Sequence, residues 1–428
     1  MTSLPVLVFD IGGRDASVST MAPSLVVPWL SRFPDVWKVA KNPLHGGVST
    51  RRAPEVNVKT VAWNEYMKST ICVAEDRAAC EPALKILLLS LSTHCLGVEV
   101  NLFYPRASYD FCRWMKKCPQ VVLQKASLKS NYGWNIKPQA LMCLLDQGFD
   151  EVIWIDSDIL VTRNIADVFS GLDSETIAAT EDGLGDEPND SNALRARLWG
   201  FSVGRVLPFG LNTGVLRVTK AHQSLLKRWW ELVRLNVYQD CQKIAEWKER
   251  PVHMKGDQDV LTALLTSREY SDIPIRILRR GKHILQFCGV WGYTTAERIA
   301  NLRGTQPTFL HQFGHKPWSE HWPSEQTVLK YVRKNYVDVS PYTLMAKRYR
   351  NELECDTEWM DPHYKLSRLL RVLGMGHSAL AGLPLSIVLD FGRLTKWAVR
   401  ALRERRRARP GPRLMSKPLS HDQAASRN

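Results

Sequence analysis

The stretch Glu151-Val152-Ile153-Trp154-Ile155-Asp156-Ser157-Asp158 is a short apolar run that ends in two aspartates separated by one residue. Four consecutive apolar residues, two of them isoleucine, predict a strand that is buried on both faces, as in a parallel sheet. Open α/β sheets bind ligands at the carboxyl edge of their strands, where Asp156 and Asp158 are expected. Paired carboxylates suit a hard divalent cation that keeps coordination positions free for phosphate oxygens.

A D-x-D triplet is not specific by itself, because about one is expected by chance in a chain of a few hundred residues. A second triplet, Asp257-Gln258-Asp259, follows Gly256 at the predicted start of a helix and not at the end of a strand. The position after a buried strand therefore distinguishes the first triplet. Residues elsewhere in the chain must support the metal site.

Strands and helices alternate on both sides of this stretch. The predicted strands are 71–74, 98–104, 121–123, 152–156, 211–218 and 308–310. The predicted helices are 82–95, 109–117, 136–145, 221–235 and 257–266, with a helical turn at 164–169 and a loop between Glu181 and Gly210. This alternation predicts an α/β fold in which helices cover the faces of a mixed, mainly parallel sheet.

Composition divides the chain into three parts. Its 428 residues are 44% hydrophobic and can bury a large core. Six prolines and few periodic patterns predict an irregular extension over 1–60. We expect the main domain at 61–335 and a helical segment with a basic tail at 336–428. The nine cysteines lack metal-ligand spacing and the N-terminus does not resemble a secretion signal, which predicts reduced thiols in a cytosolic protein.

The basic charge is concentrated near the C-terminus. Residues 391–418 carry nine of the fifteen net positive charges, so the rest resembles an ordinary soluble protein and no nucleic-acid partner is expected. Residues 391–407 predict a helix with Phe391, Leu394 and Trp397 on one face and arginines on the other. Such a helix is typical of an interfacial anchor on anionic lipid at the inner face of the cell membrane. Packing on the domain and RNA binding are the alternatives.

Four further motifs lie at the ends of predicted elements. Leu211-Asn212-Thr213-Gly214-Val215 begins a strand, and its glycine allows close backbone approach to a ligand. Gly256-Asp257-Gln258-Asp259 opens a helix, and the segment from His311 to Trp318 follows a strand. Lys137 stands before the helix that leads to the Asp156 strand. Taken singly, these residues also fit a turn former, a helix cap, a core histidine or a surface charge.

In this order the motifs resemble glycosyltransferase family 8, which contains glycogenin and bacterial lipopolysaccharide galactosyltransferases. The resemblance covers about residues 68 to 335. It implies a GT-A fold, Mn²⁺ or Mg²⁺ as cofactor, a UDP-sugar donor such as UDP-glucose or UDP-galactose, and retention of anomeric configuration. The implied reaction is hexose transfer to a saccharide or glycolipid acceptor in cell-surface glycan synthesis.

The resemblance also assigns roles to individual residues. The implied metal ligands are Asp156, Asp158 and His311, and the implied catalytic residues are Gln258 and Asp257. The implied donor contacts are Ala74, Glu75 and Asp76 at the nucleoside, Asn212 at the sugar, Lys316 at the diphosphate, and Lys137 near the sugar or the phosphates. Two features depart from the family pattern. Arg77 follows the first strand where many members carry an aromatic residue, and the loop from His311 to Lys316 is one residue shorter than is common.

Other functions fit parts of the sequence. An inverting transferase would use a carboxylate, such as Asp257 or one in the 181–190 loop, as general base. A nucleotidyltransferase would need a Gly-rich basic loop after the first strand, where Glu75 and Asp76 stand instead. A non-catalytic nucleotide-sugar-binding or membrane scaffold protein is a further alternative. Retention allows a protein nucleophile or front-face attack, and we favour the latter because Gln258 is a poor nucleophile.

Overall fold

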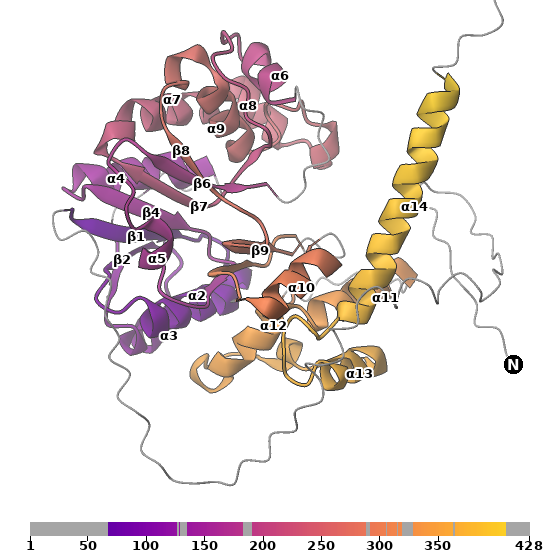
Figure 1. Cartoon of the computed structure of the whole chain (residues 1–428). Helices are drawn as coiled ribbons and strands as arrows, with labels where there is room; N and C mark the ends of the chain where they lie inside the picture. The colour runs from indigo at the N-terminus through magenta and orange to yellow at the C-terminus, as the bar shows by residue number, and fades with distance from the viewer. Residues whose placement is uncertain are drawn as a thin grey trace, which may run out of the picture. The chain divides into compact units, whose positions relative to one another are not determined.

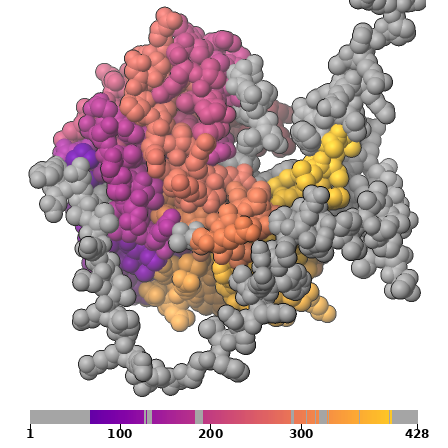
Figure 2. Space-filling model, in the orientation of Figure 1, coloured from indigo at the N-terminus to yellow at the C-terminus, as the bar shows by residue number. Residues whose placement is uncertain are grey.

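The computed structural model describes residues 67–125, 128, 135–182, 191–287, 292–304, 306–314, 316–318, 328–362 and 364–407, which are coloured by residue number in Figures 1 and 2. The expected N-terminal extension at 1–60 lies outside these residues. Contacts divide the chain into two units. One unit comprises residues 61–391, and the other comprises residues 1–60 and 392–428. The fold and the candidate site described below belong to the unit 61–391.

A seven-stranded sheet forms the centre of this unit (Figure 1), in the order β3-β2-β1-β4-β7-β6-β8. Its strands are β1 (Ser69–Ala74), β2 (Val100–Phe103), β3 (Val121–Leu123), β4 (Glu151–Ile155), β6 (Ile177–Glu181), β7 (Leu211–Thr219) and β8 (Ile275–Leu278). Only β7 runs antiparallel to its neighbours, β4 and β6, while the other pairs are parallel. The predicted mixed, mainly parallel sheet is confirmed.

Helices pack on both faces of this sheet. The helices of the described residues are α2 (Glu81–His94), α3 (Tyr109–Trp114), α4 (Lys137–Asp146), α5 (Ala166–Phe169), α6 (Ser191–Leu198), α7 (Gln223–Val233), α8 (Asn236–Gln242), α9 (Asp257–Thr266), α10 (Thr295–Arg303), α11 (Val328–Asp338), α12 (Pro341–Ala346), α13 (Lys365–Leu373) and α14 (Leu383–Arg407). Apolar side chains of α4, α7 and α9 fill one core, and those of α2, α3 and α12 fill the other. Residues of β4 alternate between the cores, with Ile153 and Ile155 in one and Val152 and Trp154 in the other. The apolar run is therefore buried on both faces, as predicted.

A second sheet of three strands adjoins the first through the end of β4. Its order is β5 (Ile159–Val161), β10 (Phe309–His311) and β9 (Ile284–Gln286). β5 follows the Asp-Ser-Asp turn directly and pairs antiparallel with β10, so that Ile159 lies opposite His311. This register brings residues that are about 150 positions apart in the chain to the same edge.

The segment between Glu181 and Gly210 corrects one expectation. It was predicted to be a loop, but it contains helix α6. The buried Arg195 donates from Nε to Oδ1 of Asp259 at 2.9 Å, which ties α6 to α9. Local sequence does not predict this helix because its stabilising ion pair is tertiary.

The segment after residue 335 shares the core of the main domain. Tyr342 and Met345 of α12 pack in the same core as α2 and α3. The helix predicted at 391–407 is present as the C-terminal part of α14. In the part of the chain that the structure describes, the cysteines are free thiols, and the helices are too short or too polar to cross a membrane.

Candidate active site

The predicted metal ligands lie at the junction of the two sheets. The backbone N–H of Asp156 donates to the carbonyl of Gly214 at 2.8 Å, which holds the end of β4 against β7. The backbone N–H of Gln312 donates to the carbonyl of Asp158 at 3.0 Å, which holds the end of β10 against the same turn. Backbone bonds therefore fix the positions of both aspartates and of His311.

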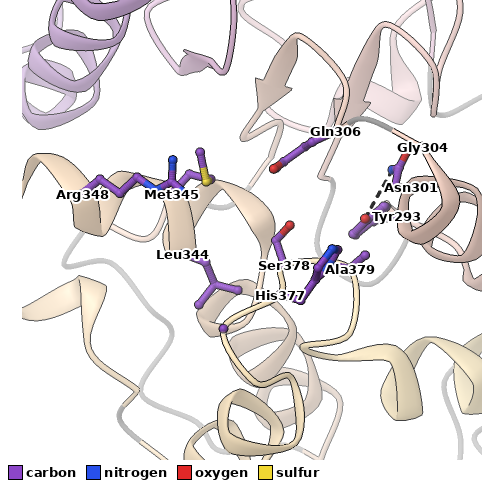
Figure 3. Close-up of a pocket in the computed structure, with 11 residues that line it drawn as sticks. Tyr293, Asn301, Gly304, Gln306, Leu344, Met345, Arg348, His377, Ser378 and Ala379 are labelled. Carbon is purple, nitrogen blue, oxygen red and sulfur yellow. Dashed lines mark hydrogen bonds between the residues drawn. The ribbon is translucent and has the colours of Figure 1, made fainter. Parts of the chain in front are cut away.

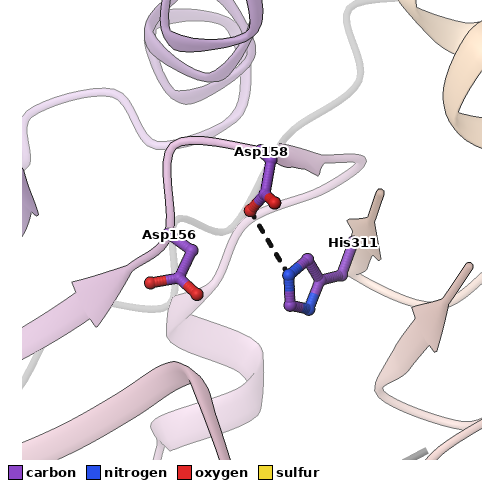
Figure 4. Close-up of side chains that lie close together, drawn as sticks. All are labelled: Asp156, Asp158 and His311. Carbon is purple, nitrogen blue, oxygen red and sulfur yellow. Dashed lines mark ion pairs between the residues drawn. The ribbon is translucent and has the colours of Figure 1, made fainter. Parts of the chain in front are cut away.

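Asp156, Asp158 and His311 converge in space (Figure 4). Each can offer one ligand atom, and these three atoms lie within 4.8 Å of one another. Nε2 of His311 lies 3.3 Å from Oδ1 of Asp158. Two opposite ligands of an ion bound at about 2.1 Å are about 4.2 Å apart, so small side-chain shifts would close this cluster on one ion. Two carboxylates with one imidazole form a donor set that suits a divalent cation such as Mn²⁺.

The environment of His311 fits this assignment. The imidazole is buried, and its Nδ1 has no hydrogen-bond partner among the described residues. Nε2 is the nitrogen that faces the carboxylate of Asp158. In a neutral ring with the hydrogen on Nδ1, the lone pair of Nε2 could bind a divalent cation together with oxygen atoms of the two aspartates.

Asp158 keeps its negative charge although it is buried. Nζ of Lys316 donates to Oδ2 of Asp158 and, at 2.6 Å, to the carbonyl of Gln312. Burial opposes ionisation, but the nearby Lys316 and His311 outweigh it and hold the pKa of Asp158 well below its usual range. Asp158 is therefore a carboxylate near neutral pH, as a metal ligand must be. The structure places Lys316, the predicted diphosphate contact, at this carboxylate.

Lys137 lies buried between two carboxylates. Its Nζ is 3.0 Å from Oδ1 of Asp156 and 3.6 Å from Oδ2 of Asp257, and it donates to Oγ1 of Thr213 at 2.9 Å. Burial opposes its charge, but Asp156 and Asp257 outweigh burial and raise the pKa of Lys137. Because these protein groups occupy its ammonium, we assign Lys137 as a positioning residue that holds both carboxylates.

Asn212 and Gln258 form a polar chain beside the cluster. Nδ2 of Asn212 donates to Oε1 of Gln258 at 3.1 Å, and Nε2 of Gln258 donates to Oδ2 of Asp182 at 3.4 Å. Oδ1 of Asn212 accepts from the backbone N–H of Gly214 at 2.9 Å, which fixes the amide orientation. Gln258 is partly exposed and can meet a substrate hydroxyl.

Asp257 is more enclosed than Gln258. It is the first residue of α9, it is buried, and its Oδ2 accepts from Oγ1 of Thr213 at 3.0 Å. Burial raises the pKa of Asp257, and the neighbouring Asp156 adds to the rise although Lys137 opposes it. Of the two predicted catalytic residues, Gln258 is therefore the one that is open to a ligand.

At the predicted nucleoside edge, the carboxylate of Glu75 is already hydrogen-bonded by other protein side chains. Glu75 is buried and accepts at 2.8 Å from both Nε and Nη2 of Arg77, and it also accepts from Oγ of Ser157. Burial opposes ionisation, but Arg77 and Ser157 outweigh it and lower the pKa of Glu75. Ala74 and Asp76 on either side are partly exposed. Arg77, whose side chain is half exposed, presents a guanidinium at this edge instead of an aromatic ring.

Gly214 provides space for protein side chains. A Cβ at this position would lie 2.8 Å from Oδ1 of Asn212 and 2.8 Å from Cε1 of His311. The sequence predicts that this glycine allows the backbone to approach a ligand closely. The described neighbours show that it leaves room for the side chains of Asn212 and His311 against the backbone of β7.

We expect Gly214→Ala to reduce metal-dependent activity at least tenfold, since the added methyl group would displace His311 from the aspartates by several tenths of an ångström. Activity and Mn²⁺ affinity, measured by titration calorimetry, check this expectation. Gly392→Ala is the control, because a methyl group at that position would meet no atom within 4 Å. Gly171→Ala would not serve, because the φ of +74° at Gly171 strains any other residue. Equal Mn²⁺ affinity of Gly214→Ala and the parent protein would contradict the expected displacement of His311.

Two residues of the site were missed by sequence reasoning. Thr213 links Lys137 to Asp257, and Ser157 links the Asp-Ser-Asp turn to Glu75. Their only sequence signal is adjacency, since Thr213 stands next to Asn212 and Ser157 stands between the two aspartates.

A separate cavity of about 290 Å³ lies near α10 and α12 (Figure 3). Asn301, Gln306, Met345 and Ser378 line it, and Nδ2 of Asn301 donates to the hydroxyl of Tyr293 at 3.3 Å. None of the predicted site residues lines this cavity.

No protein-family profile matches this sequence. No curated protein matches it either. Several solved glycosyltransferase structures are similar to it. Mouse xyloside xylosyltransferase 1 is 15% identical over 57% of this chain and 97% of that one, with a TM-score of 0.39. The galactosyltransferase LgtC, solved with donor and acceptor sugar analogues, is 14% identical over 68% of this chain and 98% of its own, with a TM-score of 0.38.

A glycosyltransferase involved in glycosylation of the major capsid of PBCV-1 is 13% identical over 58% of this chain and 94% of that one, with a TM-score of 0.34. Similarity at this level carries no inference about reaction or substrate. An inference about the reaction must therefore come from the side chains of the site.

Proposed function

We propose that this protein is a metal-dependent glycosyltransferase that moves a hexose from a nucleotide-diphosphate sugar to a saccharide or lipid-linked acceptor. The observation that carries the proposal is the convergence of Asp156, Asp158 and His311 at the end of β4, next to the polar pair Asn212 and Gln258. The first group suits a diphosphate-bound cation, and the second suits sugar hydroxyls. The resemblance to family 8 agrees with this arrangement.

The proposed chemistry assigns a distinct task to each side of the site. Cleavage of a sugar–phosphate bond places negative charge on the departing diphosphate, which a divalent ion held by Asp156, Asp158 and His311 would stabilise. Lys316 neutralises Asp158 in the structure, and its ammonium can turn to a diphosphate oxygen once another cation compensates that carboxylate. No protein acid is then needed to protonate the leaving group.

The sugar side would bind hydroxyls and stabilise positive charge on the ring. Asn212 and Gln258 offer amide donors and acceptors, and Asp257, which precedes Gln258 at the start of α9, would supply negative charge. Since Asp257 is enclosed by Thr213 and Lys137, and an amide is a poor nucleophile, we propose retention by front-face attack of the acceptor. UDP-glucose or UDP-galactose is the proposed donor and Mn²⁺ the proposed ion, both supported by the family resemblance.

One observation favours an inverting mechanism as the second candidate. Asp182 is partly exposed and lies beside Gln258, with 3.4 Å between Oδ2 and Nε2, which puts a carboxylate at the sugar side, where an inverting enzyme needs a general base. The anomeric configuration of the product, determined by NMR, separates the two mechanisms.

We expect hydrolysis of a UDP-hexose by the purified protein to depend on Mn²⁺ and to fall at least about 100-fold with a chelator. A screen of several nucleotide-sugars with Mn²⁺, Mg²⁺ or EDTA measures this, with release of the nucleoside diphosphate as readout. Turnover that is unaffected by the chelator would argue against the metal-dependent mechanism. Absence of turnover with every donor would favour the non-catalytic binding protein.

We also propose that the basic C-terminal tail holds the protein at the inner face of the cell membrane. The support is its sequence, in which residues 391–418 carry a net charge of +9. A lipid-linked acceptor would be available there.

A further inference from the structure

The outward face of α13 is apolar and basic. Residues Lys365, Arg368, Leu369, Val372 and Leu373 follow the spacing i, i+3, i+4, i+7 and i+8, which places them on one face of a helix. All five are exposed, and the exposed fractions of Leu369, Val372 and Leu373 are 54%, 74% and 54%. The opposite face is anchored, because the buried Ser367 donates to Oδ2 of Asp338 at 2.9 Å. The apolar side chains are therefore held outward by a docked helix.

The first turns of α14 also expose large apolar side chains. Ile387, Val388 and Phe391 lie on one side of the helix, and the exposed fractions of Val388 and Phe391 are 66% and 68%. Met375, which lies between the two helices in sequence, is 68% exposed. Soluble proteins rarely leave several large apolar side chains exposed together without a partner. We call the outward residues of α13, Met375 and these three residues of α14 the apolar surface.

The two helices that carry the apolar surface contribute to the same small buried cluster. Leu370 of α13 belongs to a small buried cluster with Val339 and Ala381, and Leu385 of α14 packs against it. The carboxylate of Asp390 accepts from the backbone N–H of Thr295 at 2.7 Å, so the only acidic residue of these first turns is directed toward α10. Neither outward face carries an acidic residue.

Charge identifies the partner. α13 contributes Lys365 and Arg368 beside its exposed leucines, and the chain continues from Phe391 into the segment of net charge +9. An anionic lipid surface matches this combination. Its acyl chains can take up the apolar side chains, and its negatively charged headgroups can pair with the lysine and the arginine. A second copy of this chain would bring the same positive charges face to face.

We propose that the apolar surface of α13 and α14 docks on an anionic membrane, in addition to the tail. Leu369, Val372 and Leu373 would enter the boundary between headgroups and acyl chains, and Lys365 and Arg368 would contact lipid phosphates. Docking itself does not depend on the proposed glycosyltransferase activity. The expected benefit of docking, which is access to lipid-linked acceptors, rests on that proposed function.

Sedimentation of the full-length protein with vesicles tests the proposal, without any nucleotide-sugar. The probes are vesicles of phosphatidylcholine with phosphatidylglycerol and vesicles of phosphatidylcholine alone. We expect binding to the anionic vesicles, at least about tenfold weaker binding to the neutral ones, and weakening with added salt. The variants Leu369→Glu/Leu373→Glu on α13 and Ile387→Glu/Val388→Glu on α14, which leave the tail unchanged, are each expected to lower the partition coefficient at least about tenfold.

A matched control is available on the same domain. Leu96 and Tyr109 are 80% and 81% exposed and lie outside the apolar surface, so Leu96→Glu/Tyr109→Glu adds the same charge. This control should bind like the parent protein. Circular dichroism of every variant checks folding, and gel filtration checks association between copies. Equal vesicle binding by the parent and both α13 and α14 variants would overturn the proposal and leave the tail as the only anchor. A dimer that dissociates in these variants, with no vesicle binding by the parent, would also overturn it.

Discussion

Asp158→Asn is expected to lower metal-dependent donor turnover at least about 1,000-fold, which corresponds to about 4 kcal/mol of transition-state stabilisation. The substitution preserves the size of the side chain but removes its charge. Asp158 is the member of the cluster that contacts both His311 and Lys316. An amide would weaken the hold on a divalent ion and would also remove the anchor of the proposed diphosphate lysine.

Turnover of the donor and Mn²⁺ affinity, measured together, check this prediction. Asp110→Asn is a matched control, because Asp110 is an exposed aspartate on α3 that pairs with Arg113 at 2.9 Å, away from the cluster. The control should keep both properties. Full activity of Asp158→Asn with Mn²⁺ would remove Asp158 from the proposed metal site, whereas a loss of thermal stability with unchanged Mn²⁺ affinity would indicate a purely structural role.

The elements that sequence predicted best are those with a strong local pattern. β3 at Val121–Leu123 and α9 at Asp257–Thr266 have the predicted bounds, and β4 is shifted by one residue. An apolar run and a polar helix start are encoded within a few neighbouring residues. Besides β6, β8, β9, α8 and α10, the elements β5 and α6 were missed. β5 has only three residues, and α6 depends on the tertiary ion pair between Arg195 and Asp259.

The candidate site was predictable as a set of residues but not as a geometry. Asp156, Asp158 and His311 do converge, and the reason is the register between β5 and β10, which places Ile159 opposite His311. Local sequence does not encode that register. Likewise, Glu75 looked available for a nucleoside, but its carboxylate is used by Arg77.

Lys137 is the residue whose interpretation the structure changes most, and its removal is expected to destabilise the fold. Lys137→Met should lower the free energy of unfolding by about 3–5 kcal/mol, because it leaves the buried Asp257 and the partly buried Asp156 without their shared cation. Urea unfolding without metal measures this change. Lys116→Met, which removes an exposed lysine, should leave stability within about 0.5 kcal/mol of the parent.

A positioning role for Lys137 has two further consequences. Adding Asp257→Asn to Lys137→Met should recover part of the lost stability, since one of the two unpaired carboxylates is then neutral. Mn²⁺ should raise the melting temperature of Lys137→Met more than that of the parent, because a bound cation beside Asp156 compensates the missing ammonium. A lysine that served only as a surface contact for the donor would produce neither effect, and its substitution would raise KM for the donor while the unfolding curve stayed the same.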